Sequence, residues 1–206
     1  MARLDAKAKL LESALGAFRE RGYAATTVDD LCRAAGVTKG AFFHHFPSKE
    51  ALAVAAADHW RETTGALFEA APYHAPQDPL ERVLAYIDFR KQLLSGDVAG
   101  FTCLVGTLVQ ETYASHPAIR EACARSIFAH AETLEADIQA AIEKAGLKPA
   151  WTAKSLALHT QAVLQGAFIL AKASGSAALA GQSVDHLKRY VETLFGAAGS
   201  GRQAKH

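Results

Sequence analysis

The fold of this chain is decided by residues 26–52, which read TTVDDLCRAAGVTKGAFFHHFPSKEAL. Thr27 is predicted to cap a first short helix, because Asp30 follows three residues later in the capping-box position. Gly36 supplies the residue that tolerates a positive φ at the next turn. Thr38 is then placed to cap a second short helix. Two short helices joined at a tight turn match the helix-turn-helix pattern.

The second short helix begins with small and polar residues that allow it to enter a major groove: Thr38, Lys39, Gly40 and Ala41. Its N-terminal amides also favour a nearby phosphate. The aromatic and aliphatic residues around it, Val37, Phe42 and Phe46, are expected to be core residues rather than contacts. Residues 1–50 carry an excess of only two positive charges. Charge by itself therefore does not indicate a nucleic-acid-binding protein.

The composition bounds the class of protein. The chain has 206 residues, of which 50% are hydrophobic and 21% charged, with a formal net charge of +1. These values exclude disorder over most of the length and predict a sizeable core. The chain has three cysteines, Cys32, Cys103 and Cys123. This number is small and odd, which argues against a secreted protein held together by disulfides. The charged N-terminus is unlike a signal peptide, and the most apolar segment, residues 155–171, is interrupted by polar residues. A soluble, cytoplasmic protein is expected.

Apolar residues recur every three or four positions almost throughout, so the fold class is predicted to be all-α. Beyond a first helix that Gly22 stops, helices are expected over 48–70, 79–94, 100–113, 117–145 and 153–174, and from a Ser183 cap to Phe195. Prolines 72, 76 and 79 form the best domain-boundary signal in the chain.

The N-terminal pattern closely resembles that of TetR-family transcriptional regulators. The residues that carry the resemblance are TTVDDL (26–31), AAGVTKG (34–40) and FFHHFPSKEAL (42–52). The chain length and the all-helical remainder agree with it, although the C-terminal part resembles the family only in architecture. The resemblance implies a three-helix helix-turn-helix DNA-binding domain followed by a helical ligand-binding and dimerisation domain. It also implies a ligand-responsive regulator, expected to be a repressor.

By this resemblance the residues expected to meet DNA are Thr38, Lys39 and Gly40 at base edges, Phe43 and His44 beside them, and Thr27, His45 and Lys49 at phosphates. Family members often carry Tyr where this chain has Phe43. Phenylalanine lacks the hydroxyl that reaches a phosphate, but it can contact a thymine methyl group. His44 and His45 are expected to hold phosphate more tightly when they are protonated.

The resemblance and the proline cluster together predict the domain organisation. Residues 1–47 form the DNA-binding domain, 48–70 a connecting helix, 71–196 the ligand-binding and dimerisation domain, and 197–206 a flexible tail. Because a single recognition helix covers one half-site, a homodimer on a palindromic operator is expected. The last two helices are rich in small and apolar residues and are the predicted dimer interface.

The intervening helices are expected to enclose a pocket for a small apolar or aromatic effector. The candidate wall residues are Phe89, Phe101, Cys103, Leu104, Leu108, Phe128, His130 and Phe168, with Gln110, Tyr113 and Gln165 as polar groups. Each of them alone also fits an ordinary core position.

Three alternatives remain open at this point. Cys103 stands at a predicted helix start, where a thiol pKa can be lowered, so a thiol-based electrophile or redox sensor is possible beside a plain structural cysteine. A helical enzyme lacks any catalytic motif in the chain. An architectural DNA binder would have a filled core without a pocket. Neither a cofactor nor a metal is expected, because Cys103, Cys123, His116 and His130 include no closely spaced ligand pair.

Overall fold

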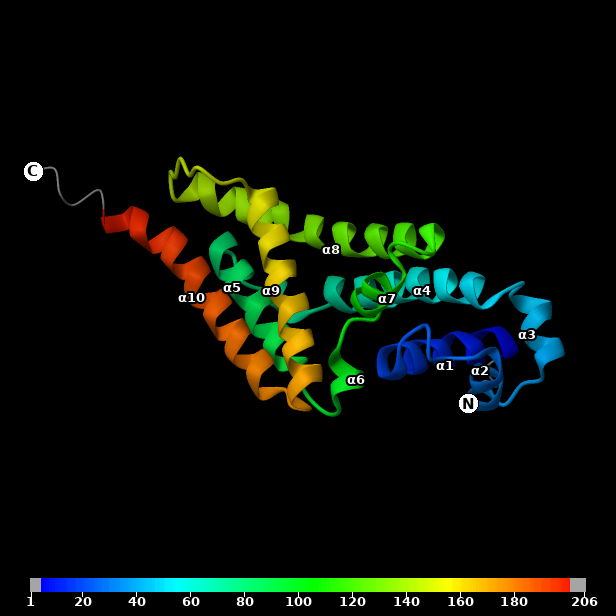
Figure 1. The fold of residues 1–206 in the computed structure, drawn as a ribbon. Coiled ribbons are helices and arrows are strands. Elements are labelled where there is room, and N and C mark those ends of the chain that lie inside the picture. The colour runs from blue at the N-terminus through cyan, green and yellow to red at the C-terminus, as the bar shows by residue number, and fades with distance from the viewer. Residues whose placement is uncertain (1–4, 201–206) are drawn as a thin grey trace, which may run out of the picture. The chain divides into compact units, whose positions relative to one another are not determined.

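The computed structural model describes residues 5–200, and within this range it contains helices and no strand (Figure 1). The predicted all-α class is therefore confirmed. The helices are α1 (Ala6–Arg21), α2 (Val28–Ala35), α3 (Lys39–His45), α4 (Lys49–Glu69), the 3-10 turn η1 (Pro72–His74), α5 (Pro79–Gln92), α6 (Val98–Phe101), α7 (Leu104–Thr112), α8 (Pro117–Lys144), α9 (Ala153–Ser174) and α10 (Ala178–Ser200).

The described chain packs as two compact units. The first unit comprises residues 5–69 and 102–127, and the second comprises 70–101 and 128–200, so that α8 contributes to both. The predicted domains follow the order of the chain, whereas the packing groups residues 102–127 with the N-terminal helices. The reason is that α7 packs against α1 and α4.

The helix ends of the N-terminal region follow from local chemistry. Thr27 and Asp30 form the predicted capping box at the start of α2. Gly36 ends α2 in the left-handed conformation, with φ 63° and ψ 39°. Thr38 caps α3 by accepting a hydrogen bond from the Ala41 amide at 3.2 Å. Gly22 ends α1 with φ 84°. All four of these sequence predictions are confirmed.

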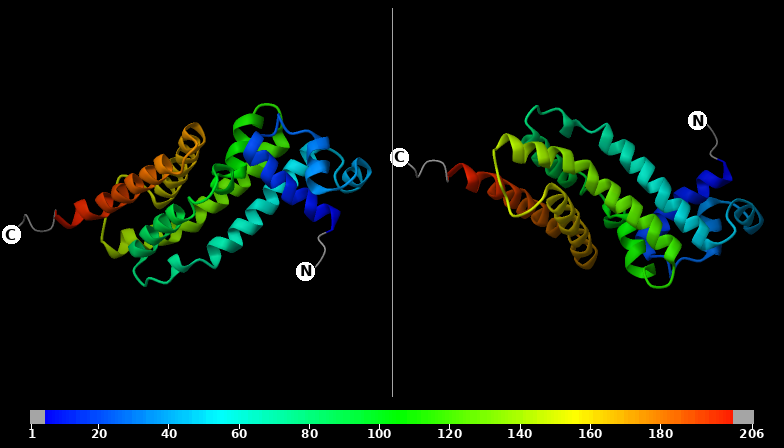
Figure 2. Two further views of the ribbon diagram at one scale, coloured as in Figure 1. Left: turned by 90° about the horizontal axis from the view of Figure 1, so that it is seen from below. Right: turned by 90° about the horizontal axis from the view of Figure 1, so that it is seen from above.

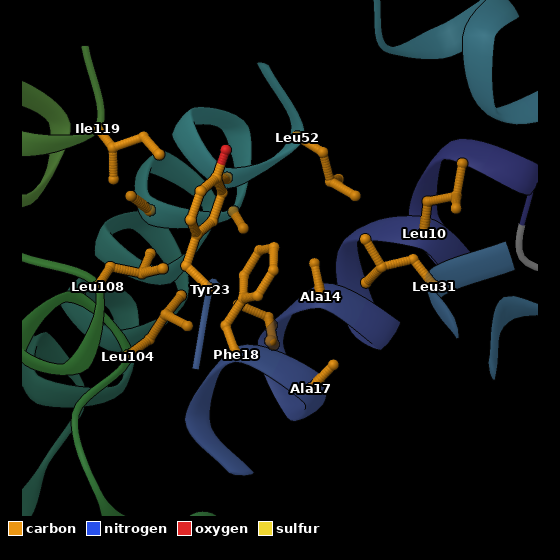
Figure 3. Packing of buried hydrophobic residues seen from close by; sticks show 14 of the residues in the cluster. Leu10, Ala14, Ala17, Phe18, Tyr23, Leu31, Leu52, Leu104, Leu108 and Ile119 are labelled. Atoms are coloured by element: carbon orange, nitrogen blue, oxygen red, sulfur yellow. The ribbon is translucent and has the colours of Figure 1, made fainter. Parts of the chain in front are cut away.

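The first unit has one continuous hydrophobic core (Figure 3). Its largest fully buried side chains are Leu10, Phe18, Leu31, Phe42, Leu52, Leu104, Leu108 and Ile119. Each such side chain contributes roughly 1.5–3 kcal/mol through the apolar surface that it removes from water. The core therefore joins α1–α4 to α7 and to the first part of α8.

The second unit is built around α5, α9 and α10. Figures 1 and 2 show α9 and α10 as consecutive helices that lie close together near the turn between them and spread apart toward their other ends. Helix α10 packs against both α9 and α5. Near one end of this pair, Ala167, Ala171 and Ala180 are almost completely buried. Alanines have no bulk beyond Cβ, so the two helices approach closely there.

Two predicted helix boundaries are wrong. The helix predicted over 100–113 is interrupted, because Cys103 adopts an extended conformation and its Sγ accepts the Gly106 amide as the cap of α7. The last helix begins at Ala178 rather than after Ser183. Its first amide is bonded by the Ser176 hydroxyl, whereas the Ser183 hydroxyl donates to the Leu179 carbonyl inside the helix.

The predictions at the C-terminal end and on α4 have mixed outcomes. On α4, the spacing of apolar residues predicts that Leu67 points inward, but this side chain is 48% exposed. The predicted tail, residues 197–206, overlaps α10 as far as Ser200, and residues 201–206 lie outside the described residues. Over the described part of the chain, none of the helices combines the length and the apolar character that crossing a membrane requires.

The two glycines Gly36 and Gly16 give a matched stability test. A Cβ at either position would meet no atom within 4 Å, but only Gly36 has a positive φ. Gly36→Ala is therefore expected to lower the free energy of unfolding by roughly 1–2 kcal/mol through backbone strain alone. Gly16→Ala, inside α1, is expected to raise it by about 0.5–1 kcal/mol. Urea unfolding followed by circular dichroism measures both, and equal shifts in the two variants would contradict this explanation.

Candidate nucleic-acid interface

Helix α3 divides its side chains sharply between core and solvent. Phe42 is fully buried, whereas Phe43, next to it, is 53% exposed, and the two rings meet edge to face at 5.1 Å. Phe46, at the end of the helix, is also buried. The predicted base-reading residues Thr38, Lys39, Gly40, Phe43 and His44 are all exposed. One short helix thus presents a mixed polar and aromatic surface.

An ion pair holds the ammonium group of Lys39 in this surface. Its Nζ lies 2.8 Å from Oδ1 of Asp29 on α2, and both side chains are exposed. The hydrogen bond to Asp29 raises the pKa of Lys39. Exposed ion pairs contribute little to stability, so a phosphate group can displace this carboxylate at small cost. Lys39 therefore carries its full positive charge, and its ammonium group can leave the Asp29 carboxylate to bind a phosphate.

The hydroxyl of Thr27 is used inside the capping box. It donates to Oδ2 of Asp30 at 2.6 Å and accepts the Asp30 amide at 3.1 Å. This hydroxyl, together with the Thr27 amide, lowers the pKa of Asp30 to about 2. The carboxylate of Asp30 also receives a hydrogen bond from Arg33. The phosphate contact predicted for Thr27 stays a prediction, and the role that is visible is the helix cap.

Two adjacent histidines end α3. The rings of His44 and His45 are 4.9 Å apart; His44 is exposed, and His45 is partly buried. Positive charge is favoured in the last turn of a helix, where carbonyl groups lack partners within the helix. The two imidazole rings therefore lie at the end of α3 where a positive charge is stabilised.

The phosphate contact predicted for Lys49 stays a prediction, and the role that is visible is a contact with backbone carbonyls. The Nζ of Lys49 donates to the carbonyls of Tyr23 at 2.8 Å and Thr26 at 2.9 Å, and it lies 4.1 Å from the centre of the Tyr23 ring. Burial lowers its pKa, an effect that the nearby Glu111 carboxylate opposes. In this structure the ammonium group fixes the chain between α1 and α2.

The predicted effector-pocket residues are distributed over both units. The first unit contains Cys103, Leu104, Leu108, Gln110 and Tyr113, and the second contains Phe89, Phe101, Phe128, His130, Gln165 and Phe168. Leu104 and Leu108 are fully buried core residues, whereas Tyr113 and Phe128 are more than half exposed. Gln110 is also exposed and donates to the Gly106 carbonyl within α7.

His130 lies in a polar cluster of the second unit, in which Tyr86 and Gln161 are buried and His130 and Arg90 are partly buried. The Nε2 of His130 is 2.8 Å from the Tyr86 hydroxyl and 3.1 Å from Nη1 of Arg90. Gln161 of α9 donates to the same hydroxyl at 3.1 Å. The guanidinium of Arg90 lies 5.9 Å from the Tyr86 ring and 5.8 Å from the Phe168 ring. Burial, and secondly the charge of Arg90, lower the pKa of His130 to about 3.

Sequence reasoning missed three members of this cluster, Tyr86, Arg90 and Gln161. Tyr86 and Arg90 are one helical turn apart, and Gln161 is a polar residue in a strongly apolar helix. Those two signals are present in the sequence, but neither indicates that the residues meet each other or His130.

The three cysteines differ in how deeply they are buried. Cys103 is partly buried as the cap of α7, while Cys123 is fully buried and burial raises its pKa to about 12. Cys32 lies in the core of the first unit, and burial raises its thiol pKa. Among residues 5–200 the structure gathers no group of three or more histidine, cysteine, aspartate or glutamate side chains suited to a metal ion.

The low pKa of His130 makes stability depend on pH. The folded protein keeps His130 neutral down to about pH 3, whereas the unfolded chain takes up this proton near pH 6.5. The free energy of unfolding should therefore fall between pH 6.5 and 3, by up to about 1.4 kcal/mol per pH unit from this group. His130→Gln should show a shallower decline. Urea unfolding of both proteins at pH 7 and pH 5 measures the difference, and parallel declines would refute the assignment.

Comparison with known proteins agrees with this arrangement. Residues 10–56 match the family model of bacterial regulatory proteins of the tetR family. Residues 79–179 match the C-terminal domain of LmrA/YxaF-like transcriptional regulators. The two models match in succession along the chain, the first over the helix-turn-helix and the second over α5 to the start of α10.

Among curated relatives, the HTH-type transcriptional regulator TtgR of Pseudomonas putida is 40% identical over 76 residues, which are 37% of this chain and 36% of TtgR. The HTH-type transcriptional regulator LmrA of Bacillus subtilis is 31% identical over 125 residues, 58% of this chain and 63% of LmrA. The matches thus span about a third of the first relative and less than two thirds of the second.

Solved structures resemble the chain over almost its whole length. A TetR-family regulator from Agrobacterium tumefaciens shares the fold with a TM-score of 0.79 at 22% identity, over 90% of this chain and 96% of that one. A TetR transcriptional regulator from Chloroflexus aurantiacus has a TM-score of 0.77 at 26% identity, over 90% and 93%. The helix-turn-helix, the helical second unit and both matching family models agree, and the chain belongs to the TetR family of bacterial regulatory proteins.

Proposed function

We propose that this protein is a transcriptional regulator that binds double-stranded DNA through α3. The observation that carries the proposal is the division of α3, in which Phe42 is fully buried while Phe43 is 53% exposed. Burial of Phe42 orients the exposed face, so that Thr38, Lys39 and Gly40 can meet base edges in a major groove. Phe43 supplies an apolar contact suited to a thymine methyl group.

A regulator is favoured over a helical enzyme by the way the reactive groups are used. Cys103 caps a helix, Cys123 is fully buried, and His130 is bonded to Tyr86. These groups serve the packing of the helices. The HTH-type transcriptional repressor DhaR of a Mycobacterium species is 31% identical to this chain over 111 residues, which are 54% of the chain. We therefore propose that this regulator represses transcription.

Dimerisation through α9 and α10 belongs to the same proposal. Four large apolar side chains on these helices, Ile169, Leu170, Leu179 and Tyr190, are between 41% and 49% exposed. Large apolar side chains with this much exposure are typical of residues that a protein interface covers. A second copy would bring a second α3 to the next major groove, about 34–36 Å away on a palindromic site.

The second unit is the proposed place of effector binding. The ring of Tyr73 packs against the rings of Tyr86 and Phe89 there. The guanidinium of Arg90 lies against the rings of Tyr86 and Phe168. This environment favours a small apolar or aromatic molecule. A coupling of about 1–3 kcal/mol between effector and DNA changes DNA affinity by about fivefold to 150-fold.

The proposal is tested by selecting duplexes from a random-sequence library with the purified full-length protein. Enrichment of a palindromic sequence is expected. Lys39→Ala should weaken binding of the enriched duplex by about tenfold, because one specific base contact is worth roughly 1–3 kcal/mol. Lys148→Ala removes the same charge from an exposed position in the second unit and should leave affinity within about twofold. Failure to enrich any duplex, or equal effects of the two substitutions, would overturn the proposal.

The histidine pair at the end of α3 predicts a dependence on pH. Imidazoles gain a proton as pH falls from about 8 to about 6, so affinity for the enriched duplex should rise over this range at constant ionic strength. The double variant His44→Gln, His45→Gln should lose most of this rise. Fluorescence anisotropy at several pH values checks it, and an unchanged affinity in the intact, folded wild type would refute the prediction.

A further inference from the structure

The chain between α1 and α2 is held from two sides by side chains of opposite charge. The carboxylate of Glu111, near the end of α7, accepts the Ala24 amide at 3.0 Å. The ammonium of Lys49, at the start of α4, donates to the carbonyls of Tyr23 and Thr26. The acid therefore satisfies a donor of this turn, and the base satisfies two acceptors. Hydrogen bonds to charged groups are the stronger class of hydrogen bond in proteins.

Gly22 shows how closely Glu111 approaches the turn. A Cβ built at Gly22 would lie 2.0 Å from Oε1 and 2.8 Å from Cδ of Glu111. Gly22 also has φ 84°, a conformation that other residues rarely adopt. The carboxylate thus occupies the space that a side chain at position 22 would need. The positive φ favours glycine at this position, and any other residue would also displace the Glu111 carboxylate.

The same turn is tied into the core. The Tyr23 ring is 7% exposed, packs on Phe18 at 5.7 Å, and meets the His116 ring edge to face at 4.9 Å. The hydroxyl of Thr26, which is fully buried, donates to the Gly22 carbonyl at 2.7 Å. In Figure 3, Tyr23 and Phe18 lie next to Leu104 and Leu108 of α7. Glu111 therefore belongs to the packed contact between α7 and the turn.

The position of the turn, together with the burial of Leu31 and Phe42, constrains where α2 and α3 can point. Thr27, the cap of α2, follows Thr26 directly, and α3 follows α2 after only three residues. The direction in which the chain leaves this turn is thus the starting direction of α2. A small shift of the turn would move the exposed face of α3 relative to α1.

We infer that Glu111 is a positioning residue for DNA recognition, which holds the turn at Gly22–Ala24 and so keeps α2 and α3 in the orientation that fits DNA. The inference rests on the proposed function. Glu111 would thus raise the affinity for DNA through the geometry of the turn, although its negative charge alone would lower that affinity. When the turn is released, only part of the population keeps the fitting orientation, and the apparent affinity falls by that fraction.

Two substitutions distinguish the effect of the length of the Glu111 side chain from the effect of its charge. Glu111→Asp keeps the charge but shortens the side chain by one methylene, so the bond to the Ala24 amide is lost. Glu111→Gln keeps the reach and an amide oxygen that can accept this bond, but it removes the charge. The probes are the duplex enriched by the wild-type protein and an unrelated duplex of equal length. Glu121→Asp, at an exposed position on α8, is the matched control.

We expect Glu111→Asp to weaken binding of the enriched duplex about tenfold, which corresponds to a competent fraction of about one tenth. Glu111→Gln should remain within about threefold of the wild type, and Glu121→Asp should not change. Binding of the unrelated duplex, which depends on phosphate contacts, should be the same for both acidic forms. Circular dichroism confirms that each variant is folded at the assay temperature.

Other outcomes overturn the inference. Tighter binding by Glu111→Gln with unchanged binding by Glu111→Asp would show that the charge of Glu111 acts simply by repelling DNA. Equal affinity of all folded variants, with a lower melting temperature for Glu111→Asp, would limit Glu111 to a structural role. If the wild type enriches no duplex, the proposed function itself fails, and this result is distinct from both.

Discussion

Burial of the Phe42 ring under α3 is the constraint on which the DNA-facing surface depends. Helix α3 has seven residues, which is too short for a helix to be stable in water by itself. Its stability comes from the Thr38 cap and from the core contact of Phe42. Once this residue points inward, helical geometry turns Lys39, Gly40 and Phe43 outward. The exposed face of α3 then consists of those residues of the helix that do not point into the core.

The core that receives Phe42 reaches well beyond the three N-terminal helices. It includes Leu104 and Leu108 of α7, which are more distant in sequence but belong to the same cluster of buried side chains. The charged contacts of Glu111 and Lys49 with the α1–α2 turn lie at the margin of this core. The DNA-facing helices are therefore positioned by apolar burial in the centre and by a few charge-assisted hydrogen bonds at the edge.

The second unit uses a polar cluster in place of a purely apolar centre. Tyr86, Arg90, His130 and Gln161 come from three helices, and their bonds join α5 to α8 and α9. Desolvation keeps His130 neutral, so its ring nitrogen can accept a hydrogen bond. Breaking such a cluster leaves buried polar groups without partners, which is costly. This cost favours one register of the three helices over others.

The sequence by itself determined the helical class, the ends of α1 and α2 and the exposed residues of α3. These depend on neighbours three or four positions away, as for Thr27 with Asp30 or Thr38 with Ala41. Only the tertiary structure decided that Lys49 binds the carbonyls of Tyr23 and Thr26, and that Glu111 reaches the amide of Ala24, 87 residues away in sequence. It also decided the break at Cys103. Such contacts join residues whose separation along the chain carries no periodic signal, and their geometry exists only after the core has formed.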